Sequence, residues 1–138
     1  MKTALTHCAL HVTDIDASIA FYESFCGLEV VHSHGEGSGR TVRMAAEGGE
    51  TLFVIVLVPG GEQRNQAPGD MTHYGVAVGR RQDIDEIARR GREAGCLHWE
   101  PQEHSYPVGY LCALRDPDGY VIEFSYGQPL GPGAGEAG

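Results

Sequence analysis

The chain of 138 residues and 14.8 kDa has the length of one ordinary domain. Its composition, with 41% hydrophobic and 21% charged residues, 20 glycines and 7 prolines, excludes collagen-like and disordered chains. The formal net charge of −9 opposes binding to nucleic acids or anionic lipid, and no apolar run approaches the roughly 20 residues of a membrane span.

The N-terminal sequence MKTALTHCALHVTD lacks the uninterrupted apolar stretch of a signal peptide. The cysteines, at positions 8, 26, 96 and 112, include no C-x-x-C pair of the kind that holds zinc or undergoes redox exchange. We therefore expect a cytoplasmic protein with four buried, reduced thiols, which binds neither nucleic acid nor membrane.

An internal repeat organises the chain. The pattern Thr-His-x-x-x-x-Val at residues 6–12 recurs at residues 72–78, and the Asp-Ile-Asp at 14–16 recurs at 83–85. Each copy also has a glycine at the expected end of a helix, Gly27 and Gly95. The repeat indicates one supersecondary unit that is used twice.

In the first copy, a strand over residues 6–12 precedes a helix with Asp14 as a plausible N-cap and Gly27 as its C-terminal stop. The apolar face of this helix is expected to hold Ile15, Ile19, Tyr22 and Cys26. Three strand-like runs follow, over residues 28–34, 41–46 and 51–58.

In the second copy, a strand over residues 72–78 precedes a helix that we expect to be capped by Asp83 and Glu86 and to end at Gly95. Its apolar face is predicted to contain Ile84, Ile87 and Ala88. Strands are expected over residues 96–100, 108–115 and 120–126. The fold class is therefore α+β, with two tandem βαβββ modules at about 4–58 and 71–127, a linker at 59–70 and a flexible tail at 128–138.

Strand alternation predicts which side chains share a face. In the first strand, His7, Ala9 and His11 oppose the bulkier Cys8, Leu10 and Val12. In the second copy, the set that contains His73 is similarly small, and Glu123 shares its face of the last strand with Val121 and Ser125. Small residues beside a polar one leave space for a ligand.

Two imidazoles and one carboxylate on rigid strands suit Fe(II), Mn(II), Zn(II) or Ni(II), with further coordination positions left for water and substrate. The alternative is that His7 and His73 are ordinary strand histidines and that Glu123 is a surface acid. The symmetric placement of the two histidines in the repeat favours one divalent metal ion held by His7, His73 and Glu123.

The segments THCALHVTDIDASIAFYESFCGLEV, THYGVAV and DPDGYVIEF, with the βαβββ pattern between them, resemble the vicinal oxygen chelate superfamily. This superfamily includes glyoxalase I, extradiol dioxygenases, fosfomycin-resistance thiol transferases and bleomycin-resistance proteins. The resemblance implies a single domain in which a curled mixed sheet surrounds a cleft with a divalent metal. It places His7, His73 and Glu123 at the family's ligand positions and implies a homodimer whose cleft combines strands of both subunits.

The members of this superfamily differ in ways that the sequence addresses. Glyoxalase I-like members use a fourth, carboxylate ligand on the last strand of the first module, where residues 51–58 contain no acid. Fosfomycin-resistance enzymes need basic groups around a phosphonate, whereas residues 100–104 are acidic and no Arg or Lys follows Arg115. Extradiol dioxygenases need only two histidines and a glutamate, with a histidine and a tyrosine as acid/base groups.

The leading hypothesis is a divalent-metal-dependent enzyme, a dioxygenase or a glyoxalase-like lyase or isomerase, that acts on a small oxygenated substrate chelated to the metal. An extradiol-type dioxygenase is slightly favoured, and a fosfomycin-type thiol transferase is an alternative. His104 and Tyr110 are the candidate catalytic groups; His11, Arg43 and Tyr106 are the candidate substrate contacts, whereas Trp99 is expected in the core or rim. A different class, a metal-free drug-binding protein similar to bleomycin-resistance proteins, suits the acidic charge.

Overall fold

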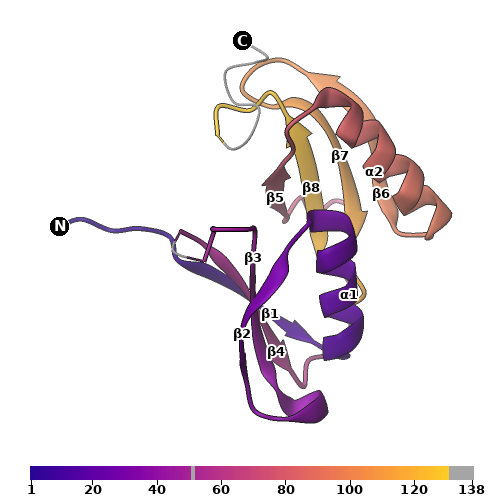
Figure 1. Ribbon diagram of the computed structural model, residues 1–138. Coiled ribbons are helices and arrows are strands. Elements are labelled where there is room, and N and C mark those ends of the chain that lie inside the picture. The colour runs from indigo at the N-terminus through magenta and orange to yellow at the C-terminus, as the bar shows by residue number, and fades with distance from the viewer. Residues whose placement is uncertain (51, 131–138) are drawn as a thin grey trace. The chain divides into compact units, whose positions relative to one another are not determined.

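The computed structural model describes residues 1–50 and 52–130, so Thr51 and most of the predicted tail at 128–138 lie outside the described residues. The chain divides into two compact units, residues 1–65 and 66–138 (Figure 1). The boundary falls within the stretch at 59–70 that the sequence predicts as a linker.

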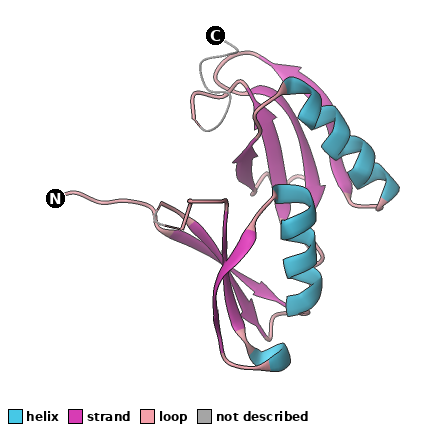
Figure 2. Ribbon diagram, in the orientation of Figure 1, coloured by secondary structure: helices cyan, strands magenta, loops and turns pink. Residues whose placement is uncertain are grey.

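The first unit contains β1 (His7–Val12), α1 (Ile15–Cys26), β2 (Glu29–His34), the short 3₁₀ helix η1 (Gly37–Gly39), β3 (Thr41–Ala45) and β4 (Val54–Pro59). Its sheet has the order β1-β4-β3-β2, with β1 parallel to β4 and the other pairs antiparallel. The helix α1 lies against one face of this sheet (Figure 2).

The second unit repeats this plan with β5 (Tyr74–Ala77), α2 (Arg81–Glu93), β6 (Leu97–His104), β7 (Gly109–Arg115) and β8 (Val121–Tyr126). The strand order β5-β8-β7-β6, with β5 parallel to β8, is equivalent to that of the first unit. The predicted fold class, α+β with two tandem βαβββ modules, is confirmed, and each module forms its own four-stranded mixed sheet.

Helix α1 has the ends that the sequence predicts. The Asp14 side chain accepts hydrogen bonds from the backbone N–H groups of Asp16 and Ala17, both at 3.1 Å, and Gly27 closes the helix at φ 63°. Its buried face is centred on Ile15, Ser18, Phe21 and Tyr22, whereas the predicted Ile19 and Cys26 are half-buried. The buried face of α1 is therefore rotated toward Phe21 relative to the predicted face.

Helix α2 begins earlier than predicted. Its N-cap is Arg80, and Asp83 is the third helical residue, whose carboxylate accepts a hydrogen bond from the Arg80 backbone N–H at 3.1 Å. Glu86 pairs with Arg89 instead of capping the helix. Asp14 and Asp83 therefore cap their helices from different positions, although the sequence repeat aligns them. The predicted apolar face of Ile84, Ile87 and Ala88 is buried.

The strand alternation has the predicted consequence in the first unit. Leu10 and Val12 are buried beneath α1, together with Val42, Met44 and Leu57, whereas His7, Ala9 and His11 point to the opposite, exposed face. The second unit keeps this polarity, but β5 begins at Tyr74, so His73 lies just before the strand. The face that carries the histidine is thus the helix-free face of each sheet.

The expectation of four buried thiols is wrong for three of them. Only Cys112 is buried; Cys8, Cys26 and Cys96 are half-buried, and all four are free thiols. The cause is position, because Cys112 lies on the central strand β7 under α2, whereas the others lie on an edge strand or at element ends. Neither helix within the described residues has the length and apolarity that a membrane-spanning helix needs.

Candidate metal centre

Glu123 and His73 meet on the helix-free face of the second sheet. Glu123 lies on β8, opposite Gly75 of β5 and Ala113 of β7, so only small side chains flank its carboxylate on that face. The residue is 8% exposed. His73 Nε2 lies 2.8 Å from Glu123 Oε2. A buried carboxylate is unfavourable unless it is paired, and His73 supplies this partner.

The outer atoms of both side chains are held by neighbours. His73 Nδ1 lies 2.6 Å from the carbonyl oxygen of Met71, which only accepts, so Nδ1 carries the hydrogen of this bond. The Gln128 side-chain amide donates to Glu123 Oε1 at 3.0 Å. These contacts leave His73 Nε2 and Glu123 Oε2 facing each other at the cavity.

This geometry fits a divalent ion. Two ligand atoms that are each about 2.1 Å from a metal and about 90° apart are about 3.0 Å from each other. The 2.8 Å between His73 Nε2 and Glu123 Oε2 is close to that value. A histidine whose other nitrogen donates to a backbone carbonyl also has the usual arrangement of a metal-bound imidazole. Within each unit, the described residues hold no group of three possible ligands, so this pair needs a further ligand from elsewhere.

The pair opens into a cavity of about 670 Å³, which we call the His73 cavity. Trp99 forms part of its wall, with its ring edge-on to His73 at a centroid distance of 5.4 Å. The cavity is otherwise lined by both apolar and polar side chains: Met71, Gln102, His104, Val108, Leu111 and Gln128. Such a lining suits a small organic molecule with a few polar groups.

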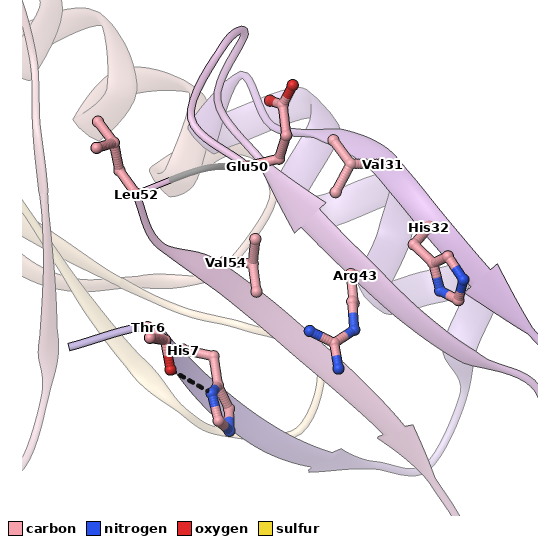
Figure 3. A pocket seen from close by; sticks show the side chains of 8 residues that line it. All are labelled: Thr6, His7, Val31, His32, Arg43, Glu50, Leu52 and Val54. Atoms are coloured by element: carbon pink, nitrogen blue, oxygen red, sulfur yellow. Dashed lines mark hydrogen bonds between the residues drawn. The ribbon is translucent and has the colours of Figure 1, made fainter. Parts of the chain in front are cut away.

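His7 lies at the start of β1 on the helix-free face of the first sheet. Its Nδ1 is 2.9 Å from the Thr6 hydroxyl, and this contact fixes the ring. The other ring nitrogen, Nε2, lies on the side of the ring away from Thr6 (Figure 3). It lines a pocket of about 560 Å³, the His7 pocket, whose other lining residues are Thr6, Val31, His32, Arg43, Glu50, Leu52 and Val54. The predicted substrate contact Arg43 thus shares a pocket with His7.

The remaining predicted site residues lie in two places. His104 lines the His73 cavity, and its Nε2 donates to Gln102 Oε1 at 2.7 Å. It also borders a smaller cavity of about 220 Å³ that contains Tyr106 and Tyr110. His11, on β1, has its Nε2 3.2 Å from the Pro59 carbonyl oxygen, a contact that joins β1 to the end of β4.

Tyr110 does not line the His73 cavity, and its hydroxyl is hydrogen-bonded to a residue of α2. Its hydroxyl donates to Asp85 Oδ1 at 2.5 Å, and the Arg81 guanidinium lies 3.9 Å from its ring centroid. The hydrogen bond to Asp85, with burial, raises the pKa of Tyr110. The structure therefore places this phenol in a network with α2.

Sequence reasoning does not identify Met71 or Gln128 as part of the site, and it assigns Trp99 to the core or rim. Gln128 lies in the segment predicted as a tail, and a backbone carbonyl such as that of Met71 leaves no signal in the side-chain pattern. Trp99 reaches the face of Glu123 through register shifts on both sides of it in β6. Such bulges break the alternation by which a sequence predicts a face.

Comparison with known proteins identifies the family. The model of the Glyoxalase/Bleomycin resistance protein/Dioxygenase superfamily matches residues 4–124. The chain belongs to this superfamily. The resemblance seen in the sequence is thereby confirmed, and the two βαβββ modules are the modules of the glyoxalase fold.

Relatives of this glyoxalase-superfamily chain include Uncharacterized protein PA2024 of Pseudomonas aeruginosa, 53% identical over 97% of this chain and 96% of that protein. Glutathione transferase FosA of Serratia marcescens is 26% identical over 92% of this chain and 83% of that protein.

Solved structures share the fold. A glyoxylase/bleomycin resistance protein/dioxygenase domain from Frankia sp. EAN1pec has a TM-score of 0.68 at 23% identity, covering 90% of this chain and 97% of that one. A mutant of the fosfomycin resistance protein FosX of Listeria monocytogenes, complexed with Mn(II) and 1S,2S-dihydroxypropylphosphonic acid, has a TM-score of 0.71 at 18% identity, covering 91% of this chain and 90% of that one.

Proposed function

We propose that this chain is a divalent-metal-dependent enzyme that acts on a small oxygenated organic molecule. His7, His73 and Glu123 hold the ion, and neighbouring oxygens of the substrate bind to it. When bound, the ion supplies Lewis-acid stabilisation of an enolate-like or catecholate anion. The proposal combines one ligand from the first unit with two from the second, within one chain or across a homodimer.

The observation that carries the proposal is the His73–Glu123 pair. The Met71 carbonyl holds His73 through Nδ1 and the Gln128 amide holds Glu123 through Oε1, so that the facing Nε2 and Oε2 can bind one ion between them. A buried carboxylate beside a cavity also supplies the negative charge that stabilises a bound cation.

Within the His73 cavity, we assign the acid/base role to His104, which lines it. Its Nε2–H donates to Gln102, so Nδ1 is the nitrogen that can accept a proton. Trp99 and Leu111 supply apolar wall that limits access of water to bound substrate. A histidine of this kind is what the extradiol-dioxygenase hypothesis requires, and it supports that hypothesis.

Thiol transfer of the fosfomycin-resistance type is the second candidate, and it fits equally well. The FosA relative is a glutathione transferase, and a FosX structure of the same fold holds Mn(II) with a phosphonic acid. The sequence argument against this activity is that residues 100–104 are acidic and that no Arg or Lys follows Arg115. Arg43, which lines the His7 pocket, supplies a cation from the first module instead.

Metal content tests the proposal. Protein purified without chelator should contain one divalent ion per chain, measured by elemental analysis. After removal of the ion, titration with Mn(II) should quench the fluorescence of Trp99, the single tryptophan, because its ring lies against His73. Protein without stoichiometric metal and without a fluorescence response would instead support a metal-free, sequestering protein.

A further inference from the structure

The His7 pocket carries a row of basic side chains on one face of the first sheet. In the sheet register, His32 of β2 is opposite Arg43 of β3, Arg43 is opposite Val56 of β4, and Val56 is opposite Ala9 of β1. Directly opposed residues point to the same face of a sheet. His32 and Arg43 therefore lie on the face that carries His7, two residues along β1 from Ala9.

Arg43 differs from other arginines of this acidic chain. Arg40, Arg80, Arg81, Arg89 and Arg92 each form an ion pair with a carboxylate. Arg43 is exposed, and none of the residues that the structure describes forms an ion pair or hydrogen bond with its guanidinium. In a chain with 19 acidic and 10 basic residues, a cation left without a carboxylate at a pocket is available for a ligand.

The pocket directs this cation inward. Figure 3 shows the Arg43 guanidinium extending over β4 toward the side of His7, whereas the carboxylate of Glu50 at the rim points away from both. Glu50 is the single carboxylate among the lining residues that the structure describes. Val54 and Leu52 add apolar wall, which strengthens the attraction between the guanidinium and an anion by displacing water.

We infer that the substrate is an organic anion whose oxyanion group, a carboxylate or phosphonate, binds to Arg43 with His32 beside it. A guanidinium presents two parallel N–H groups that match the spacing of two oxygens on either group. The other end of the molecule reaches the metal at His7, so this inference rests on the proposed function for that end. The anion site itself needs only residues of the first unit.

The first experiment uses the metal-free protein and therefore tests the anion site alone. Methylphosphonate and acetate are titrated into ¹⁵N-labelled protein. The Arg43 Nε–H resonance is followed by NMR in wild type, and the backbone amide resonances of the pocket residues His32 and Val54 are followed in wild type and every variant. We expect a saturable shift, with affinity reduced about tenfold or more in Arg43→Gln, since a hydrogen-bonded charge contributes about that factor. Arg40→Gln, which removes the same charge from the same unit outside the pocket, should retain wild-type affinity. Arg43→Lys should bind less tightly than wild type because it loses the two-point contact.

The second experiment uses Mn(II)-loaded protein and two chelating probes. Acetohydroxamate offers two adjacent oxygens, and succinic monohydroxamate adds a carboxylate at the other end. By calorimetry, the carboxylate should tighten binding about tenfold in wild type and Arg40→Gln and give no gain in Arg43→Gln.

The outcomes separate the two claims. Mn(II) and acetohydroxamate binding without any gain from the carboxylate, and without an Arg43 shift in the metal-free protein, would overturn the inference and leave the proposed function intact. An Arg43 shift in protein that binds no Mn(II) would retain the anion site and overturn the proposed metal function. A higher affinity for methylphosphonate than for acetate would assign the substrate to the phosphonates. The reverse order of affinities would assign it to the carboxylates.

Discussion

Glu123 supplies the only negative charge of the proposed ligand set. Glu123→Gln removes that charge with little change in volume. We expect the affinity for Mn(II) to fall by at least about tenfold, because substitution of residues that only hydrogen-bond to a metal ligand commonly causes a loss of that size. The fold should persist, because the adjacent residues Ile122 and Phe124, on the opposite face of β8, are buried in the core. Metal titration monitored by Trp99 fluorescence measures the effect. Glu62→Gln, at an exposed position, is the control, and equal affinities in all three proteins would reject the site.

Gln128 acts on Glu123 as a positioning residue. Its amide donates to Oε1, so Gln128→Leu leaves that oxygen without its partner and allows the carboxylate to rotate. We expect Mn(II) affinity to fall up to about tenfold, less than for Glu123→Gln. The exposed Gln82→Leu serves as the control. Unchanged affinity in Gln128→Leu would show that this hydrogen bond does not orient the carboxylate for the ion.

At the scale of the elements, helix α2 packs on its sheet through a glycine. A Cβ at Gly91 would overlap Leu114 Cδ2, and Leu114 is fully buried on β7. Gly91→Ala should therefore lower the free energy of unfolding by about 1–2 kcal/mol, because overpacking outweighs the gain in helix propensity. Gly79→Ala, at a position with open space and an ordinary φ, should be close to neutral. Urea denaturation compares the two, and a stabilised Gly91→Ala would show that Leu114 readjusts without cost.

The packing of α2 on its sheet also buries Cys112 and thereby changes the acidity of its thiol. Burial raises its pKa to about 12, whereas the pKa of an unfolded thiol is about 8.5. As pH rises above about 8.5, the unfolded chain loses this proton while the folded chain keeps it, so folding stability falls with pH. Urea unfolding at pH 8 and pH 10 should show a larger loss for wild type than for Cys112→Ala. An equal loss in both would place the alkaline effect on other groups.

Thiol labelling adds a second measurement of the same burial. At pH 8, Cys112 should react with a disulfide reagent only as fast as the protein unfolds, whereas the half-buried Cys8 and Cys26 should react sooner. Rapid labelling of Cys112 in the folded protein would contradict its placement under α2.

At the scale of the whole molecule, the proposal joins two units through one ion. If His7 and His73 bind the same ion, the losses in Mn(II) affinity for His7→Ala and His73→Ala should not add, because the first substitution already disrupts the site that the second would weaken. Metal should also stabilise wild type by about 2.7 kcal/mol at a hundredfold excess over Kd and stabilise the double variant far less. Additive losses, or full stabilisation of either single variant, would show separate sites.

The sequence by itself determines the local structure. The Asp14 cap, the Gly27 stop and the alternation of small and bulky residues in β1 act over a few residues, so the pattern predicts α1 and the two faces of the first sheet. The repeat predicts the second module and places His7 and His73 at equivalent positions of the two modules. The start of α2 is predicted wrongly, because Asp83 caps it from the third helical position by accepting from the Arg80 backbone N–H, a pattern that the repeat does not share.

The tertiary structure decides which distant residues meet. The bulges of β6 bring Trp99 to the face of Glu123, and the chain beyond β8 returns Gln128 to the carboxylate. The order β1-β4-β3-β2 places Arg43 on the face of His7, whereas Tyr110 is bound by Asp85 of α2. These contacts depend on strand register and on the path of the chain between elements. Both are set by packing across the whole unit, which no short stretch of sequence contains.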